Sequence, residues 1–326
     1  MTRIVASHTM DTAEMRAAYA GTLIELADQN EKIVALEADL MGAGGMGVFQ
    51  KAHPDRLFDV GIAEQSMVGM AAGLAVVGFV PFVHTFGTFA TRRPCDQIYI
   101  SCAYSRTNVK LVGSDPGITG ALNGGTHQSM EDIALLRPIP NITILEPSDA
   151  VQLTWAICAA AETEGLFYIR MHRKPAMRVY EEGSDFTVGK GVVVRQGTDV
   201  TILVSGALMM EQALKAAEKL ESQGITARIV DLVSIKPLDE ELILRCAAET
   251  GAILVAENHF AAGGVASAVA EVLVEHAVGV PFRGTGIRDS FGEVGEVSYL
   301  LERFGMSGAH LAEMARQLVE RKAGAK

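Results

Sequence analysis

One acidic side chain stands where general acid–base chemistry could be done. Glu64 lies in the segment DVGIAEQ, residues 59–65, at the start of a helix expected over residues 63–77. A carboxylate in the first turn of a helix is stabilised by the helix dipole, by about 0.3–1 kcal/mol, which is a purely structural interpretation. A desolvated carboxylate can instead share a proton with a ring nitrogen of a ligand. Glu64 is therefore the first candidate catalytic residue.

Two aromatic rings and a histidine are the next candidates. Phe86 and Phe89 follow an apolar strand expected near residues 79–83, where a flat ligand ring could stack on them. His127 lies in the loop GGTHQ, whose glycines allow the backbone to approach a ligand closely. A histidine there can polarise a carbonyl group or stabilise an oxyanion. Taken alone, the two Phe residues are more typical of a core, and His127 is equally compatible with a structural role.

The stretch GAGGMG, residues 42–47, matches the Gly-x-Gly-x-x-Gly pattern of dinucleotide-binding sites. Such a site needs a helix that presents its N-terminus to a pyrophosphate, but only residues 48–53 separate the stretch from Pro54. We interpret it as a mobile glycine-rich loop.

The elements that must position these residues follow an alternating order. Expected strands cover residues 33–37, 79–83, 109–112, 142–145 and 167–169. Expected helices cover residues 11–30 (with Thr12 as a possible cap), 63–77, 95–105 and 149–162. This alternation predicts an α/β fold with a mostly parallel sheet covered on both faces.

A polar, glycine-containing segment divides the chain. We expect domains at residues 1–182 and 191–326, joined by a linker at 183–190. Two domains also suit 326 residues, which exceed the usual size of one hydrophobic core. Expected strands of the second domain cover 200–204, 227–231 and 252–256, and its expected helices cover 209–223, 238–249, 264–276 and 307–322.

Composition narrows the class of protein. The formal net charge of −11 argues against nucleic acid or an anionic membrane as the main partner, because both require a basic surface. The four cysteines lack metal-site spacing and fit a reducing compartment. No apolar run is long enough for a membrane span or a signal peptide. We therefore expect a cytoplasmic protein.

Taken together and in order, the segments resemble the C-terminal half of transketolases and of 1-deoxyxylulose-5-phosphate synthases. The similarity covers nearly the whole chain, and the matching segments are DVGIAEQ (59–65), TFGTF (85–89), GGTHQ (124–128), EPSDA (146–150), IRMHR (169–173) and IKPLD (235–239). The chain is especially similar to the separate C-terminal subunit of split bacterial and archaeal transketolases. The resemblance implies a pyrimidine-binding domain followed by a transketolase C-terminal domain, and transfer of a two-carbon ketol unit from a ketose (phosphate) donor to an aldose acceptor.

The resemblance also implies thiamine diphosphate as cofactor. In the family, a glutamate at the position of Glu64 hydrogen-bonds N1′ of the aminopyrimidine, and aromatic residues at the positions of Phe86 and Phe89 hold that ring by stacking. Ile62 and Asp39 fall at further cofactor-side positions. A turn-forming role is an equal alternative for Asp39.

Substrate contacts implied by the resemblance are His127 and Arg173, the latter at the position of an arginine that grips a phosphate. Two positions depart from the family pattern. Asp115 stands where members commonly carry a histidine, and Asn123 stands where they carry an aspartate. These departures put the ordinary ketose and aldose phosphates in doubt. Arg92, with its neighbour Arg93, indicates either a more anionic substrate or an ion pair between domains.

The family holds the diphosphate and Mg²⁺ through a GDG…N motif on an N-terminal domain, and no GDG occurs in this chain. We therefore expect an N-terminal partner subunit that carries the motif, and two copies of each chain in a heterotetramer. Two alternatives stay open. One is a subunit of a decarboxylating ligase that acts on pyruvate, and the other is a non-catalytic regulatory subunit that has kept the fold.

Overall fold

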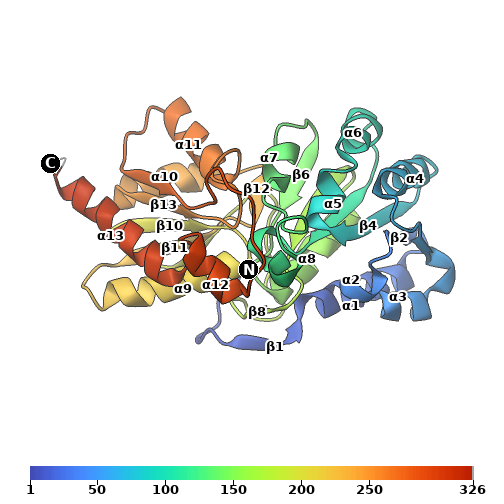
Figure 1. The fold of residues 1–326 in the computed structure, drawn as a ribbon, viewed down its shortest axis with the longest axis horizontal. Helices are drawn as coiled ribbons and strands as arrows, with labels where there is room; N and C mark the ends of the chain where they lie inside the picture. The colour runs from blue at the N-terminus through green and yellow to red at the C-terminus, as the bar shows by residue number, and fades with distance from the viewer. Residues whose placement is uncertain (325–326) are drawn as a thin grey trace.

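The computed structural model describes residues 1–324 and divides them into two α/β units placed side by side (Figure 1). The N-terminal unit is built on a seven-stranded sheet. Its strands, in spatial order, are β12 (Ser234–Lys236), β6 (Ile142–Leu145), β7 (Leu166–Met171), β5 (Lys110–Ser114), β4 (Val80–Phe86), β2 (Ile33–Glu37) and β3 (Leu57–Asp59). All neighbours from β6 to β3 are parallel, and the central strands are buried on both faces. Because both faces are buried, these strands appear in the sequence as continuous apolar runs.

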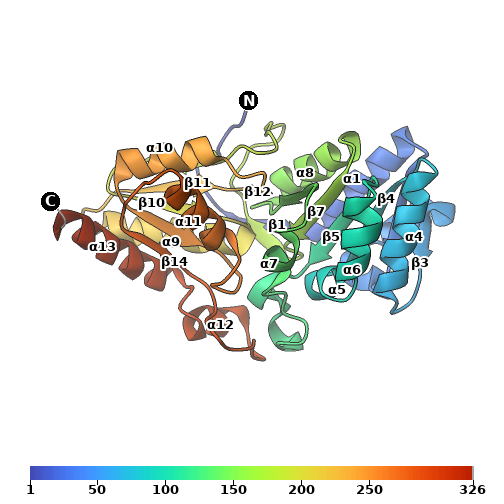
Figure 2. The same cartoon turned by 90° about the horizontal axis from the view of Figure 1, so that it is seen from above.

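Helices cover both faces of this sheet. α1 (Met15–Gln29) packs on α8 (Ala150–Glu162) on one face, and α4 (Glu64–Val76) lies on the other with the π-helix Ile98–Tyr104, as two views show (Figures 1 and 2). Shorter elements complete the unit: α2 (Met41–Gly44), α3 (Gly47–Ala52), α5 (Gly87–Thr91), α6 (Cys95–Gln97), α7 (Asp132–Leu136) and the 3-10 segments Pro54–Arg56 and Gly117–Asn123. The single helix expected over residues 95–105 is thus α6 followed by a π-helix.

The expected start of the first helix is wrong. Residues Met10–Glu14 form strand β1, which pairs antiparallel with β8 (Pro175–Met177), so Thr12 lies in a strand and caps nothing. The helix begins at Met15, and its first buried residues are Met15 and Tyr19. Pairing with β8 supplies backbone hydrogen-bond partners that the sequence pattern could not reveal.

The C-terminal unit is a five-stranded sheet between two helical layers. Its strands, in spatial order, are β14 (Phe282–Gly284), β13 (Ile253–Ala256), β10 (Val200–Val204), β11 (Ala227–Asp231) and the antiparallel edge strand β9 (Val192–Arg195). The helices are α9 (Ala207–Glu221), α10 (Glu240–Thr250), α11 (Val265–Glu275), α12 (Val297–Arg303) and α13 (Gly308–Gly324). α9 packs on α13 and α10 packs on α11. The expected α/β class with mostly parallel sheets is confirmed for both units.

The two units share a strand and a polar contact. β12 comes from the C-terminal half of the chain but extends the N-terminal sheet by pairing antiparallel with β6. Nearby, the buried carboxylate of Asp231 accepts hydrogen bonds from Tyr180 (2.6 Å), Ser148 (2.9 Å) and Gln152 (2.9 Å). Burial raises the pKa of Asp231 to about 7.

Within residues 1–324, every helix is too short or too polar to cross a lipid bilayer.

Candidate active site

Glu64 is the first residue of α4, directly after the turn that follows β3. The carboxylate of Asp59 holds this turn, because its Oδ1 accepts the N–H groups of Gly61 (2.9 Å) and Asp39 (3.0 Å). Gly61 has φ of 70°, a conformation that glycine adopts without strain. The Glu64 side chain is only 5% exposed, and its Oε1 accepts a hydrogen bond of 2.6 Å from Nη1 of Arg93. A buried carboxylate is thus held at the carboxyl edge of the parallel sheet, the usual ligand-binding edge of such sheets.

The aromatic pair and the histidine come together at the same edge. Phe86 ends β4 and Phe89 lies in α5, and their ring centroids are 6.2 Å apart. The His127 ring lies edge-on to both, at 5.9 Å from Phe86 and 5.2 Å from Phe89. Thr126 Oγ1 lies 2.9 Å from Nδ1 of His127, which leaves Nε2 as the ring nitrogen for a ligand. Three predicted site residues therefore form one cluster.

One arginine guanidinium lies over the ring of each phenylalanine in the cluster. The guanidinium carbon of Arg93 lies 4.0 Å from the Phe89 centroid, and that of Arg173 lies 5.4 Å from the Phe86 centroid. Arg173 also forms a two-point ion pair with Asp115, with distances of 2.8 Å (Nη2–Oδ2) and 3.1 Å (Nε–Oδ1). Burial raises the pKa of Asp115 although Arg173 acts in the opposite direction. The predicted phosphate-gripping arginine is thus already paired with a carboxylate.

The remaining predicted site residues lie around this cluster. Asp39, Ile62 and Asn123 are exposed, with Ile62 73% exposed. Arg92 pairs with Glu131 at 2.8 Å, and both residues belong to the N-terminal unit. The suggestion of an ion pair between domains at Arg92 and Arg93 is therefore wrong: both arginines find carboxylates inside their own unit.

A buried histidine with two polar partners lies beneath the site and was missed by the sequence analysis. His84 in β4 contacts Glu37 through Nδ1 (2.9 Å to Oε1) and Ser114 through Nε2 (3.1 Å to Oγ). Glu37 and His84 are register partners on β2 and β4. The available signal was polar residues inside otherwise apolar strands.

The glycine-rich stretch at residues 42–47 is not a loop, because it belongs to α2 and α3 and the turn between them. His84 explains why one of these residues, Gly44, is a glycine. A Cβ on Gly44 would lie 2.4 Å from Cε1 of His84, so only glycine fits. The interpretation of residues 42–47 as a mobile loop is wrong, because the stretch packs against the buried His84 and Glu37 side chains.

The C-terminal unit holds the turn that follows Asp115. Asn258 accepts the N–H of Ile118 (2.9 Å) through Oδ1 and donates to the carbonyl of Pro116 (2.8 Å) through Nδ2. Gly117, with φ of 54°, leaves room for this amide, since a Cβ there would lie 2.0 Å from Oδ1. The neighbouring Glu257 caps α11, because its carboxylate accepts the N–H groups of Val265 and Ala266 at the start of that helix. No local pattern predicted the contact of Asn258, because it joins residues 140 positions apart.

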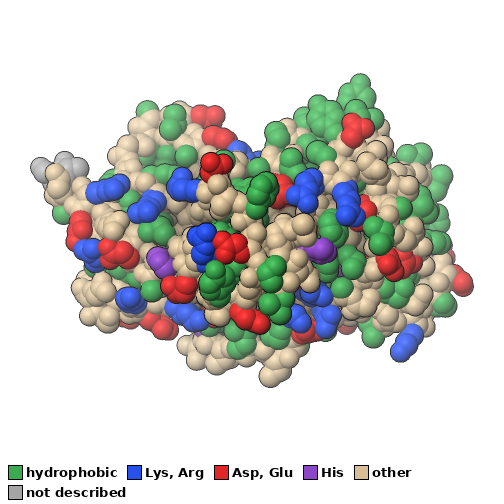
Figure 3. All heavy atoms as spheres, viewed as in Figure 1, with side chains coloured by type: hydrophobic (Ala, Val, Ile, Leu, Met, Phe, Trp, Pro, Cys, Tyr) green, Lys and Arg blue, Asp and Glu red, His purple; other side chains and the backbone are tan. Residues whose placement is uncertain are grey.

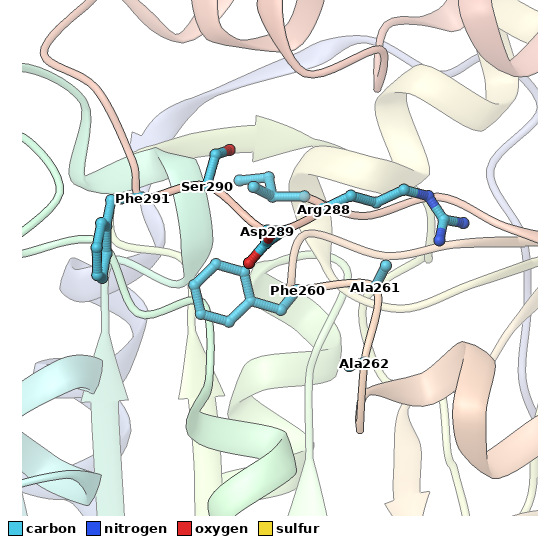
Figure 4. A pocket seen from close by; sticks show the side chains of 8 residues that line it. Phe260, Ala261, Ala262, Arg288, Asp289, Ser290 and Phe291 are labelled. Atoms are coloured by element: carbon cyan, nitrogen blue, oxygen red, sulfur yellow. The ribbon is translucent and has the colours of Figure 1, made fainter.

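A cavity of about 510 Å³ lies in the C-terminal unit, and none of the predicted site residues lines it. Figure 4 shows the Asp289 side chain directed toward the Phe260 ring, while Arg288 extends the other way. The cavity adjoins the ends of β13 and β14, as Phe260 and Ile287 follow those strands.

Comparison with known proteins gives the class. Residues 11–178 match the family model described as "Transketolase, pyrimidine binding domain", and residues 189–311 match that described as "Transketolase, C-terminal domain". The chain belongs to the transketolase family, a family of transferases, as the sequence motifs predicted.

Individual relatives refine the position within the family. The chain is 48% identical to 6-deoxy-6-sulfo-D-fructose transketolase subunit SqwH of Clostridium sp. (strain MSTE9), over 94% of this chain and 95% of the relative. It is 39% identical to 1-deoxy-D-xylulose-5-phosphate synthase of Heliobacterium modesticaldum, over 93% of this chain and 46% of that protein. A solved structure titled "Split gene transketolase, inactive beta4 tetramer" superposes with a TM-score of 0.86 at 40% identity, covering 96% of this chain and all of that one. The chain thus corresponds to a subunit of a split transketolase.

Proposed function

We propose that this chain and an N-terminal subunit together form a thiamine diphosphate-dependent transketolase, which transfers a two-carbon ketol unit from a ketose to an aldose. The observation that carries the proposal is the cluster of Phe86, Phe89 and His127, which Arg93 links to the buried Glu64 by its contacts with Phe89 and Glu64. The names of the relatives support the two-subunit arrangement.

The chain's own residues fit the pyrimidine end of this cofactor. A flat, cationic guanidinium already lies between Phe89 and Glu64, so the space accepts a planar group that stacks on one side and donates a hydrogen bond on the other. When bound, thiamine diphosphate supplies a nucleophilic carbon for attack on the ketose carbonyl. Glu64 would hold the proton of N1′, and Phe86 and Phe89 would orient the ring. Asp39 and Ile62, at the exposed edge beside Glu64, would face the cofactor and the partner.

His127 is assigned to the substrate. Its ring is fixed by the two phenylalanines and Thr126, and its Nε2 can donate to the carbonyl oxygen as negative charge develops there. Asn123 lies in the same loop region and would contact a substrate hydroxyl.

The pairing of Arg173 bears on the substrate's anionic end. A phosphate ester carries about −1.5 to −2 charges near neutral pH, whereas a sulfonate carries one. Because Asp115 already neutralises much of the Arg173 charge, the pair suits a monoanion better than a dianion. We therefore propose a ketose with a terminal sulfonate as donor, in agreement with the name of the Clostridium relative. Arg92, close to the site but paired with Glu131, would add to the attraction of an anion.

The N-terminal subunit would supply the diphosphate and Mg²⁺ ligands through a GDG…N motif. A second copy of this chain would dock on α4. That helix exposes Met70 and Val76 beside Gly69 and Gly73, at which a Cβ would meet nothing within 4 Å. Hydrophobic side chains gather over α4 and α6 on the visible face (Figure 3). Glycine inside a helix costs about 1 kcal/mol relative to alanine, and close approach of another helix is a reason to keep it.

The test reconstitutes the complex with its N-terminal partner, thiamine diphosphate and Mg²⁺. We expect ketol transfer from 6-deoxy-6-sulfofructose to an aldose phosphate, with a higher kcat/KM than from fructose 6-phosphate. The similarity to a 1-deoxyxylulose-5-phosphate synthase makes pyruvate the control substrate. Release of CO₂ from pyruvate without transfer from any ketose would overturn the proposal in favour of the decarboxylating ligase. Unchanged turnover in a Glu64→Gln complex would instead support a non-catalytic subunit.

A further inference from the structure

We propose that Arg93 is a built-in competitor of the cofactor: it occupies the place of the aminopyrimidine in the cofactor-free chain and leaves Glu64 when the cofactor binds. The inference rests on the proposed function, since it assumes that Glu64 and Phe89 hold the pyrimidine ring. It assigns a role to a residue that the motif does not include.

Arg93 makes the two contacts that the pyrimidine ring needs. Its Nη1 donates to Glu64 at 2.6 Å, and its guanidinium carbon lies 4.0 Å from the Phe89 centroid. Phe89 and Arg93 are four positions apart along a helical stretch that continues through Arg92, so their side chains lie on one face. A guanidinium is flat, cationic and able to stack, which makes it a close substitute for a protonated aminopyrimidine. One space between a ring and a carboxylate cannot hold both groups.

The contact between Arg93 and Glu64 can break readily. The Arg93 side chain is 44% exposed, whereas the Glu64 side chain is buried. A single hydrogen bond and one stacking contact hold the guanidinium, and water can solvate it once it leaves. Arg173 on the other ring is different, because it is mostly buried and makes a two-point pair with Asp115. Arg93 is therefore the movable arginine of the two.

The pair also stabilises Glu64. A buried carboxylate without a partner is costly, so Arg93 stabilises Glu64 until the cofactor arrives. The same stabilisation opposes cofactor binding, because it must be given up. Removal of Arg93 therefore tightens binding. An exposed ion pair together with a cation–π contact corresponds to a roughly 3–30-fold lower dissociation constant for thiamine diphosphate.

The experiment measures thiamine diphosphate binding by equilibrium dialysis, in the complete complex with its N-terminal partner and Mg²⁺. Wild type is compared with Arg93→Ala and with the matched control Arg92→Ala, whose arginine pairs with Glu131 instead. We expect the lower dissociation constant for Arg93→Ala alone. Equal or weaker binding by Arg93→Ala would overturn the inference, as would equal tightening by Arg92→Ala. If Arg93→Ala does not assemble, Arg93→Gln takes its place with the same expectation.

Adding free guanidinium to the Arg93→Ala complex distinguishes competition with the cofactor from a structural effect of the substitution. Millimolar guanidinium chloride should weaken cofactor binding to the Arg93→Ala complex toward the wild-type value, while sodium chloride at equal ionic strength should not. No difference between the two salts would overturn the inference. Its failure is distinguishable from failure of the proposed function. In that second case the wild-type complex would bind no thiamine diphosphate, or Glu64→Gln would leave turnover unchanged.

Discussion

Two arginine–carboxylate clusters in this chain use the same chemical groups in opposite ways. Arg93 and Glu64 make one ion pair at the sheet edge, with the arginine half exposed. Arg170, fully buried in β7, donates to Asp132 (2.8 Å) and Glu146 (2.6 Å), and to the carbonyl groups of Ser129 and Asn258. The first arginine can leave its carboxylate for water, and the second cannot. Burial and the number of bonds thus distinguish a replaceable contact from one that joins the two units.

Arg170→Met should give the largest effect, because it leaves Asp132 and Glu146 buried without their cation. We expect a loss of about 3–5 kcal/mol in the free energy of unfolding, measured by urea denaturation. Arg93→Ala, at the replaceable pair, should lower it by only about 1–2 kcal/mol, because one half-exposed ion pair and one cation–π contact are lost. Equal losses in the two variants would contradict the distinction between the clusters.

At the replaceable pair, Glu64→Gln should lower kcat without lowering the free energy of unfolding. The amide keeps the size of the side chain but cannot act as a proton acceptor for N1′. We expect kcat of the reconstituted complex to fall by about 10²–10⁴-fold. The free energy of unfolding should stay within about 1 kcal/mol of wild type. A loss of stability as large as that of Arg170→Met would show that Glu64 is mainly structural.

The sequence predicted one of these clusters in part and the other not at all. Glu64, Phe86, Phe89 and His127 were found because each lies in a short motif whose residue types and spacing can be compared with a family. Arg93 was noticed only as positive charge, since its partner lies 29 positions away. The contact of Arg170 with Asn258 joins β7 of one unit to the segment that follows β13 of the other, and β12 crosses from one unit to the other. Short-range periodicity predicts strands and helices, but it contains no information on which distant elements meet.

Asn258→Ala tests whether the segment that contacts the buried Arg170 cluster also positions the turn beside Asp115 for substrate binding. Arg170 donates to the Asn258 carbonyl, and the Asn258 amide holds the turn beside Asp115. Loss of two buried hydrogen bonds should lower kcat/KM for the ketose about tenfold, mainly through KM, with little change in thiamine diphosphate affinity. Asn108→Ala is the matched control, because Asn108 accepts the N–H of Gly165 away from the site. Equal changes in KM for both variants would mean a general loss of stability.

The last prediction concerns pH and the buried carboxyl of Asp231 at the interface of the units. Burial raises the pKa of Asp231 to about 7, whereas an aspartate in an unfolded chain has a pKa of about 3.9. Between about pH 4 and pH 7 the folded chain therefore binds more protons at this site than the unfolded chain, so its contribution to stability falls as pH rises. Asp231→Asn does not titrate. We expect wild type to lose stability relative to Asp231→Asn from pH 5 to pH 8 in urea denaturation. Parallel curves would mean that this carboxyl is ionised in the folded chain throughout, as an exposed one would be.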